Sequence, residues 1–506
     1  MQDAAPTALK TFQTYIDGHW VDAQSGETFQ SSDPYSGEAW AEIPRCGAAD
    51  VDAACAAAHR AFTEGPWPAM TQTARGRVLR KIAEGIEMHG DYLAEIEVRD
   101  NGKLISEMSA QLKYMPEWYY YYGGLADKIQ GAVVPVDKPD HFAYTLKEPV
   151  GVCGMIIPWN SPLLLVAWKL APALAAGCTV VIKPSEYTSA SLLEFMRLVI
   201  EPLDLPPGVI NVVTGYGQEA GEPLVANSHV AKVAFTGGTA TGARVGALAA
   251  QSFKKVSLEL GGKSPNIVFD DCVIDEAVNG AISGIFAASG QTCIAGSRLL
   301  VQESIHDEFV ARLVEVAKTA KLGNPMSFET QVGPVTTPPQ YEKILGYIDI
   351  AKGEGAKCVL GGGAAGTDMG GGKYFVQPTI FDHVTNDMRI AQEEVFGPVL
   401  SVITFKDEDE AVRIANDVQY GLGSGVWTQS VRRATQMAQK IRAGTVWVNT
   451  YRAVSFTMPF GGYKQSGLGR ENGMDAINEY LQTKSVWICN APNTGNPFVM
   501  KTASSD

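Results

Sequence analysis

The sequence lacks the patterns that would indicate a metal site, a disulfide scaffold or a nucleic-acid partner. Its eight cysteines form no CxxC pair, and its seven histidines form no HExxH motif. Lysine and arginine number 41 against 55 aspartates and glutamates, which gives a net charge of −14. An acidic chain is repelled by phosphate backbones and anionic lipids, so we expect neither nucleic acid nor a membrane as a partner. We expect no metal.

Targeting and membrane-spanning patterns are missing as well. The N-terminus, MQDAAPTALK, has neither a basic start nor an apolar stretch, which argues against a signal peptide. The most apolar window, residues 163–182, contains Lys169, Pro172 and Gly177, and therefore favours a buried helix followed by a strand. Scattered single thiols are typical of a reducing compartment, so we expect a cytoplasmic enzyme.

The hydrophobic pattern predicts an α/β protein of two or three domains. From residue 144 onward, short Val- and Ile-rich runs alternate with helical stretches, which is typical of βαβ units and parallel sheets. In the first half, strands are expected at 151–158, 179–183, 209–214, 230–235 and 255–260, with helices at 50–61, 74–89, 163–176, 189–199, 218–227 and 241–250. In the second half, helices are expected at 277–288, 305–320, 340–354, 408–416 and 430–441, with strands at 298–302, 399–405 and 444–448. The glycine-dense segment 361–372 is expected to be an exposed loop without a ligand.

Three segments that follow expected strands could hold a dinucleotide. Residues 237–242 (GGTATG) and 215–221 (GYGQEAG) are glycine-rich turns, but neither is a full GxGxxG motif, and each is equally compatible with a plain turn. Lys183, Ser185 and Glu186 follow the strand TVVI. A carboxylate there can accept hydrogen bonds from ribose hydroxyls and would repel a 2′-phosphate, which favours NAD over NADP. A solvated charged turn is the alternative.

Two residues have the chemistry of a nucleophile and a base. Cys293 lies among small and polar residues in SGQTCIAG, which suits an approachable thiol, although most single cysteines are buried and inert. Glu259 ends an apolar strand before two glycines. Burial there would raise its pKa and make it a usable general base, whereas a surface position would leave it an ordinary acid.

Seven segments in this order closely resemble the NAD(P)-dependent aldehyde dehydrogenase superfamily, in its non-acylating, general-substrate and betaine-type branch. The resemblance extends from about residue 15 to 486 and rests on PWN (158–160), KPSE (183–186), FTGGTATG (235–242), LELGGKSPN (258–266), GQTCIAGSR (290–298), EEVFGP (393–398) and PFGGYKQSGLGRE (459–471). It implies two parallel-sheet, Rossmann-like α/β domains with a small β oligomerisation arm. The implied activity is oxidation of an aldehyde to a carboxylic acid through a cysteine thioester.

The resemblance also assigns roles to individual residues. Cys293 would be the nucleophile, Asn160 would donate its amide to the oxyanion, and Glu259 would activate water. The cofactor would contact Trp159, Lys183, Ser185, Glu186, Gly237, Gly238, Glu394 and Phe396. The implied NAD-binding domain covers 1–130 and 150–261, the catalytic domain 262–474, the arm 131–149 and 475–495, and a C-terminal tail 496–506. A homodimer or homotetramer is expected.

The chain departs from the family pattern around the substrate. Relatives commonly carry Phe where this chain has Ser161, an aromatic residue where it has Ala287, and Ser where it has Gly238. We expect a wider tunnel for bulky or branched aldehydes, unless neighbouring side chains refill the space. The other expected walls are Tyr119, Trp168, Thr292, Ile294 and Val454. Arg452 could contact an acidic group of a semialdehyde or form a surface salt bridge.

Two rival functions stay open at this point. A CoA-acylating aldehyde dehydrogenase would pass the acyl group to CoA, but such relatives typically lack the base that Glu259 provides. A non-catalytic relative that kept only the fold is disfavoured by the presence of Cys293, Asn160 and Glu259 together.

Overall fold

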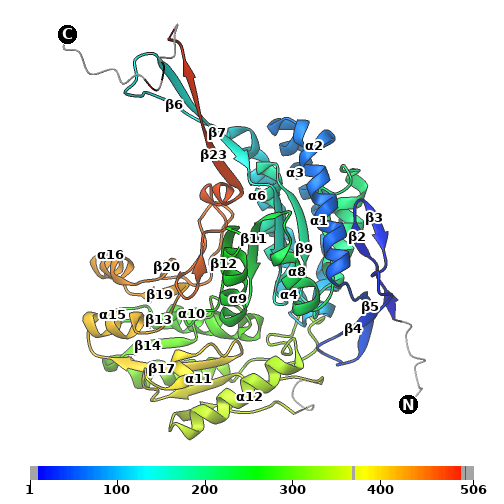
Figure 1. The fold of residues 1–506 in the computed structure, drawn as a ribbon. Helices are drawn as coiled ribbons and strands as arrows, with labels where there is room; N and C mark the ends of the chain where they lie inside the picture. The colour runs from blue at the N-terminus through cyan, green and yellow to red at the C-terminus, as the bar shows by residue number, and fades with distance from the viewer. Residues whose placement is uncertain (1–8, 367–370, 492–495, 497, 499–506) are drawn as a thin grey trace, which may run out of the picture.

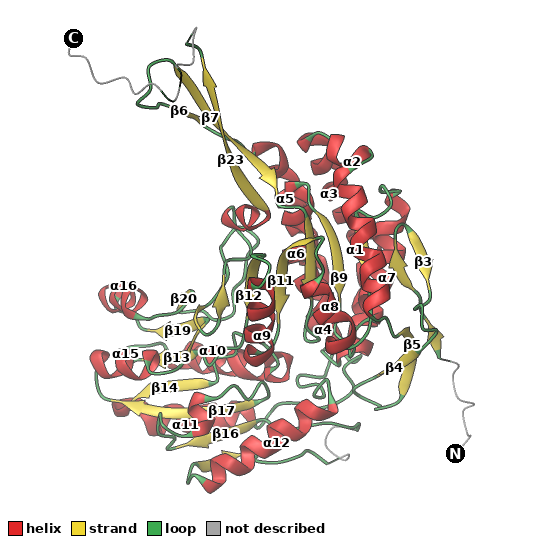
Figure 2. Ribbon diagram, in the orientation of Figure 1, coloured by secondary structure: helices red, strands yellow, loops and turns green. Residues whose placement is uncertain are grey.

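The computed structural model describes residues 9–366, 371–491, 496 and 498. Two large sheets, each covered by helices, form the body of the molecule (Figures 1 and 2). The expected C-terminal tail lies almost wholly outside the described residues, as do residues 367–370 of the glycine-dense loop. Within the described residues, no helix is both long and apolar enough to cross a membrane.

The first sheet has eight strands in the order β22-β12-β11-β8-β9-β10-β2-β3. Its five central strands are parallel: β8 (Val152–Ile156), β9 (Thr179–Lys183), β10 (Ile210–Val212), β11 (Val230–Thr236) and β12 (Lys255–Glu259). The antiparallel edges are β2 (Thr14–Ile16), β3 (His19–Val21) and β22 (Gly467–Leu468). Helices packed around it include α1 (Ala48–Thr63), α6 (Pro162–Ala176), α7 (Ala190–Phe195), α8 (Glu222–Ala226) and α9 (Thr239–Ala250).

The second sheet has seven strands in the order β15-β16-β17-β14-β13-β19-β20. It comprises β13 (Pro265–Val268), β14 (Arg298–Gln302), β15 (Lys357–Leu360), β16 (Thr379–Asp382), β17 (Val399–Phe405), β19 (Gly423–Trp427) and β20 (Thr445–Val448), of which only β15 is antiparallel to its neighbour. Its helices are α10 (Ile274–Phe286), α11 (His306–Ala317), α12 (Pro338–Gly353), α14 (Arg389–Gln392), α15 (Glu408–Asn416) and α16 (Val431–Lys440).

A three-stranded antiparallel sheet extends away from this body (Figure 1). We call it the arm; it contains β6 (Val133–Val134), β7 (His141–Pro149) and β23 (Leu481–Cys489). The remaining short strands are β1 (Lys10–Thr11), β4 (Thr28–Ser32), β5 (Ala39–Pro44), β18 (Tyr420–Gly421) and β21 (Tyr463–Lys464). The remaining helices of the N-terminal part are α2 (Pro66–Ala69), α3 (Gln72–Asn101), α4 (Ile105–Tyr114) and α5 (Pro116–Leu125).

The α/β architecture with parallel sheets is confirmed, and most expected elements are present within a few residues of their expected bounds. The helix expected at 74–89 is too short, because α3 starts at Gln72, where the Thr71 hydroxyl accepts a hydrogen bond from the Ala74 N–H, and continues to Asn101. Four strands of the second sheet, β13, β15, β16 and β19, were not expected. The helix expected at 277–288 ends instead at Phe286, because Ala288 and Ser289 take left-handed conformations.

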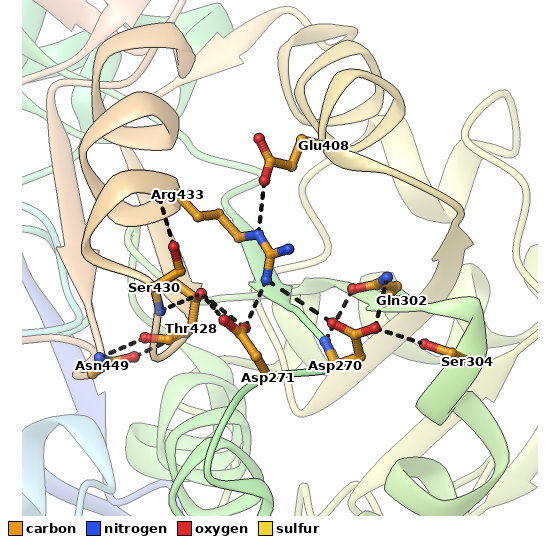
Figure 3. Close-up of polar contacts among 9 residues, drawn as sticks. All are labelled: Asp270, Asp271, Gln302, Ser304, Glu408, Thr428, Ser430, Arg433 and Asn449. Atoms are coloured by element: carbon orange, nitrogen blue, oxygen red, sulfur yellow. Dashed lines mark hydrogen bonds and ion pairs between the residues drawn. The ribbon is translucent and has the colours of Figure 1, made fainter.

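One arginine joins the segments that follow β13, β17 and β19 (Figure 3). The Arg433 guanidinium, from α16, lies 2.9 Å from Glu408 Oε1 of α15 and 2.7 Å from Asp271 Oδ1 in the loop after β13. The other acid of that loop, Asp270, has its Oδ1 3.9 Å from Arg433 Nη1. The guanidinium carbon of Arg433 lies 4.5 Å from the centre of the Phe269 ring. Arg433 therefore acts as a shared cation for three acidic groups on two segments, the loop after β13 and the start of α15.

Candidate active site

Cys293 lies just beyond a rigid turn at the end of α10. Ala288, Ser289 and Gly290 all have positive φ, and a Cβ on Gly290 would lie 2.0 Å from the Gly397 carbonyl oxygen, so only glycine fits there. The Ala288 N–H donates to Glu107 Oε1 at 2.7 Å, and the Ser289 hydroxyl donates to the Gly333 carbonyl at 2.8 Å. These bonds fix the turn that presents the thiol. Burial, together with the Glu259 and Glu394 carboxylates, raises the pKa of Cys293 to about 12.

Glu259 and Asn160 reach the same space from the first sheet. Glu259 is the last residue of β12 and is 3% exposed, and neither of its carboxyl oxygens has a hydrogen-bond partner among the described residues. Burial and the nearby Glu471 carboxylate raise its pKa well above the usual value. Asn160 follows β8, and its amide donates to the Gln291 carbonyl at 3.0 Å, two residues before the thiol.

Two cavities meet at these three residues. Cys293, Glu259 and Asn160 line both a cavity of about 450 Å³, which we call the substrate cavity, and a smaller one of about 160 Å³ on the cofactor side. A thiol, a carboxylate and an amide thus lie where two ligands could approach each other. This is the geometry that transfer of a group between two bound molecules requires.

Most of the residues expected to line the substrate cavity do so, but two of them do not. Of the expected residues, Ser161, Trp168, Thr292, Ile294 and Val454 line it. Tyr119 does not: it is fully buried, and its neighbour Trp118 lines the cavity instead. Ala287 is also absent from the lining, because the chain turns away from α10 at this point. The wall residues that sequence reasoning missed include Lys103, Gln111, Tyr114, Trp118, Leu164, Leu165 and Phe460.

A third cavity, of about 350 Å³, lies at the carboxyl ends of β8, β9 and β11. Lys183, Ser185, Glu186, Trp159, Gly237 and Gly238 line it, as the sequence pattern predicts for that sheet edge. Gly237 has its N–H bonded to the Glu259 carbonyl at 3.0 Å, and a Cβ at this position would lie 2.6 Å from the Phe235 ring. Gly238 caps α9, and nothing lies within 4 Å of the point where its Cβ would be.

Glu394 and Phe396 line the 160 Å³ cavity together with Trp159. Glu394 accepts a hydrogen bond from the Gly262 N–H at 2.9 Å, and burial raises the pKa of its carboxyl. Phe396 has a positive φ of 59° and meets the Trp159 ring edge to face at 5.3 Å. The two cofactor-side cavities share Trp159, Gly237 and Gly238, so one extended ligand could occupy both.

A buried ion pair beside Glu259 was not expected from the sequence. Lys169 of α6 and Glu471 are both almost fully buried and form an ion pair, and Lys169 Nζ also donates to Thr236 Oγ1 at 2.6 Å. Thr236 is the register partner of Glu259 on β11. A lysine within the most apolar segment of the chain was a signal that it has a buried partner, but its partner is 302 residues away.

One trio of described residues has metal-ligand chemistry. Atoms of His306, Asp382 and His383 lie within 4.8 Å of one another. Both ring nitrogens of His306 already face carboxylates, at 2.8 Å from Asp307 and 2.8 Å from Asp382, and these carboxylates raise the pKa of its imidazole. Both nitrogens of the ring are therefore already engaged by protein carboxylates, so this trio is better explained as a hydrogen-bonded cluster.

Comparisons with known proteins agree on one family. The model of the aldehyde dehydrogenase family matches residues 20–486. The chain is 47% identical over 495 residues to (Z)-2-((N-methylformamido)methylene)-5-hydroxybutyrolactone dehydrogenase from Acinetobacter baylyi, covering 97% of this chain and 100% of that protein. It is 45% identical over 480 residues to aldehyde dehydrogenase family 2 member C4 from Arabidopsis thaliana, covering 94% of this chain and 95% of that protein.

Solved structures give the same result. Betaine aldehyde dehydrogenase from Staphylococcus aureus in complex with NAD+ superposes with a TM-score of 0.95 at 40% identity, covering 96% of this chain and 97% of that one. The NAD+ complex of aldehyde dehydrogenase from Bacillus cereus superposes with a TM-score of 0.92 at 44% identity, covering 95% of this chain and 97% of that one. The chain therefore belongs to the aldehyde dehydrogenase family and is an oxidoreductase that converts an aldehyde to a carboxylic acid.

Proposed function

We propose that this enzyme oxidises a bulky aldehyde with NAD, using Cys293 as the nucleophile, Asn160 as an oxyanion donor and Glu259 as the general base. The observation that carries the proposal is that these three residues line both the substrate cavity and the adjoining cofactor-side cavity. NAD supplies the acceptor for a hydride when it is bound. Side chains and one backbone N–H of this chain carry out the other steps.

In the first half of the reaction, the Cys293 sulfur bonds to the aldehyde carbon, and the carbonyl π electrons move to oxygen. Because the thiol has its pKa raised to about 12, its proton must pass to a base, and Glu259 is the carboxylate that lines both cavities with it. The Asn160 amide and the Cys293 backbone N–H would stabilise the oxyanion, and losing one such donor typically costs about 10²–10³ in rate. Loss of hydride from the tetrahedral carbon then leaves a thioester on Cys293.

In the second half, water replaces the thiol. Glu259 takes a proton from water as its oxygen bonds to the thioester carbon, and the carbon–sulfur bond breaks to release the acid and the Cys293 thiolate. The buried Lys169–Glu471 ion pair lies beside Glu259, and its charges act on that carboxyl group. We propose that this ion pair positions Glu259.

The cofactor side of the site fits NAD. The N-terminus of α9 offers N–H groups to a pyrophosphate, and the empty space at Gly238 lets a phosphate approach the backbone. Lys183 and Glu186, 3.7 Å apart, would hold the adenosine ribose, and Glu394 would hold the nicotinamide ribose. Glu186 would repel a 2′-phosphate, so we propose a preference for NAD over NADP.

The substrate cavity supports a bulky substrate, because its volume of about 450 Å³ exceeds what a two-carbon aldehyde would fill. We further propose that the enzyme acts in the cytoplasm, which suits its eight free cysteines, and as a homo-oligomer joined through the arm.

Purified enzyme should produce NADH and one equivalent of carboxylic acid from a cyclic or long-chain aldehyde, with a higher kcat/KM than for acetaldehyde and with NAD preferred over NADP. Cys293→Ala should abolish NADH formation, whereas Cys272→Ala, which changes a thiol outside all three cavities, should not. Formation of an acyl-CoA when CoA is added, or NADH formation by Cys293→Ala, would contradict the proposal.

A further inference from the structure

The substrate cavity contains a buried amine that the reaction does not use. Lys103, which follows α3, is 6% exposed, and its Nζ donates to the Ser161 hydroxyl at 2.6 Å. Its backbone is held by a hydrogen bond of 2.9 Å from its N–H to Asn101 Oδ1. Both Lys103 and Ser161 line the cavity, so the small side chain beside Asn160 does not leave an apolar gap: it exposes an ammonium group to the substrate.

A second cation lines the same cavity. Arg452 sits in a left-handed backbone conformation, with a φ of 64°, and donates to the Ser283 carbonyl at 3.1 Å. No carboxylate in the described part of the chain lies within ion-pair distance of Arg452 or of Lys103. The surface salt bridge that the sequence left open for Arg452 is thus not formed, and its charge is available to a ligand.

The charges around Lys103 leave it protonated at neutral pH. Burial lowers its pKa to about 8, with Arg452 acting in the same direction, while Glu107, Glu97 and Cys293 act against it. Glu107 does not cancel the charge by contact, because its Oε1 accepts the Ala288 N–H instead. Most of the other lining side chains are apolar and include Trp118, Leu164, Leu165, Trp168 and Phe460, although Glu259 and Glu471 also line the cavity. Donors surrounded by such walls bind an acceptor more strongly than they would in water.

We propose that Lys103, with Arg452, determines substrate specificity by binding an oxygen acceptor, a carboxylate or carbonyl oxygen, carried on the aldehyde several bonds from its CHO group. This inference rests on the proposed function. The same two cations disfavour a quaternary ammonium group, although betaine aldehyde dehydrogenases are among the relatives. The substrate would have an apolar body, an aldehyde at one end and an oxygen acceptor at the other.

The first test uses the unmodified enzyme. Aldehydes of about four to ten carbons would be compared in matched sets: an unsubstituted alkanal, the ω-carboxy aldehyde of the same length and its methyl ester, with betaine aldehyde as the cationic case. At the best length, kcat/KM for the acid or ester should exceed that for the alkanal by about 10- to 100-fold, the effect of one hydrogen bond to a charged group. An excess for both acid and ester identifies a carbonyl-oxygen site, and an excess for the acid alone identifies a carboxylate site.

The second test uses Lys103→Met, which keeps the length of the side chain and removes its charge. The ratio of kcat/KM for the acceptor-bearing aldehyde to that for the alkanal should fall by about 10-fold or more. Arg452→Gln should lower the same ratio, and Lys113→Met, an exposed lysine on α4, should leave it unchanged. Because the readout is a ratio of two substrates on one protein sample, partial unfolding of a variant cancels from it.

The outcomes separate this inference from the proposed function. If alkanals are oxidised but no acceptor-bearing aldehyde exceeds them, or if betaine aldehyde is preferred, the specificity role is overturned while the proposed function stands. If no aldehyde gives NADH, the proposed function itself fails. An unchanged ratio in Lys103→Met would also overturn the role of that residue.

Discussion

Cys293 and Glu259 share a buried environment that opposes ionisation of both. Burial and neighbouring carboxylates raise the pKa of the thiol to about 12 and the pKa of Glu259 well above its usual value. Two negative charges side by side in such a site are costly, so the pair holds one charge more readily than two. This favours transfer of the thiol proton to Glu259 as the sulfur attacks, and the same carboxyl must lose that proton before it can activate water.

Hydrolysis of the thioester should therefore depend on pH through Glu259. The base acts when deprotonated and its pKa is raised, so the steady-state rate should fall as pH drops through a value well above that of an ordinary carboxyl group. Glu259→Gln should slow hydrolysis by about 10²–10⁴-fold. Stopped-flow NADH absorbance over a pH series would measure both.

A useful control for that experiment is the steady-state rate of Glu276→Gln, which changes an acid in the first turn of α10 and outside all three cavities. It should retain the pH profile of the unmodified enzyme. A profile in Glu259→Gln identical to that of the unmodified enzyme would assign the base to another residue.

Local sequence was informative where one segment carries its own chemistry. Cys293, Glu259 and Asn160 lie in the segments GQTCIAGSR, LELGGKSPN and PWN, and the fold brings all three to one place. The Lys169–Glu471 pair could not be predicted, because 302 residues separate its members. Tyr119 was named instead of Trp118 because the pattern of α5 does not reveal which of two adjacent aromatic residues faces the cavity.

At the scale of elements, periodicity predicted the parallel strands that are continuous apolar runs. Strands such as β9 and β17 read as Val- and Ile-rich segments and occur at the expected positions. Strand β19 has the sequence GSGVW, and its two glycines make the segment look like a loop. Gly425 must nevertheless be glycine, because a Cβ there would lie 2.4 Å from Asn266 Oδ1. Tertiary contact, which no local window contains, decides such strands.

The Arg433 cluster gives a prediction at this scale. Arg433→Met should leave Asp270, Asp271 and Glu408 without their shared cation, so their mutual repulsion and lost charge-assisted bonds should destabilise the protein by about 1–3 kcal/mol. A thermal unfolding midpoint lower by several degrees would be the readout. Because these groups are partly exposed, added salt should reduce the difference.

The neighbouring arginine provides the control. Arg432 precedes Arg433 on α16, is exposed and has no ion-pair partner among the described residues, so Arg432→Met should change stability by no more than about 0.5 kcal/mol. Equal effects of the two substitutions would show that the cluster in Figure 3 contributes nothing specific to stability.

At the scale of the whole molecule, the arm is a sheet with an uncovered apolar face. Alternate residues of β7 and their register partners on β23 place Phe142, Tyr144, Leu146, Val486 and Ile488 on one face, with Lys484 opposite Leu146 at its edge. Phe142 is 44% exposed and its partner Ile488 is 43% exposed. A three-stranded sheet that extends from the body with such a face is unfavourable in water unless another surface covers it.

A second copy of this chain is the partner that the family resemblance implies, and a pair of facing charges would test it. Phe142→Lys together with Ile488→Lys places two like charges opposite each other on the apolar face, so it should shift the enzyme from an oligomer towards monomers in light scattering after size exclusion. Met88→Lys, at a 77% exposed position on α3, adds a charge elsewhere and should leave the mass unchanged. An unmodified enzyme that elutes as a monomer would refute the role of the arm, and a double variant that stays fully assembled would place the contact on another surface.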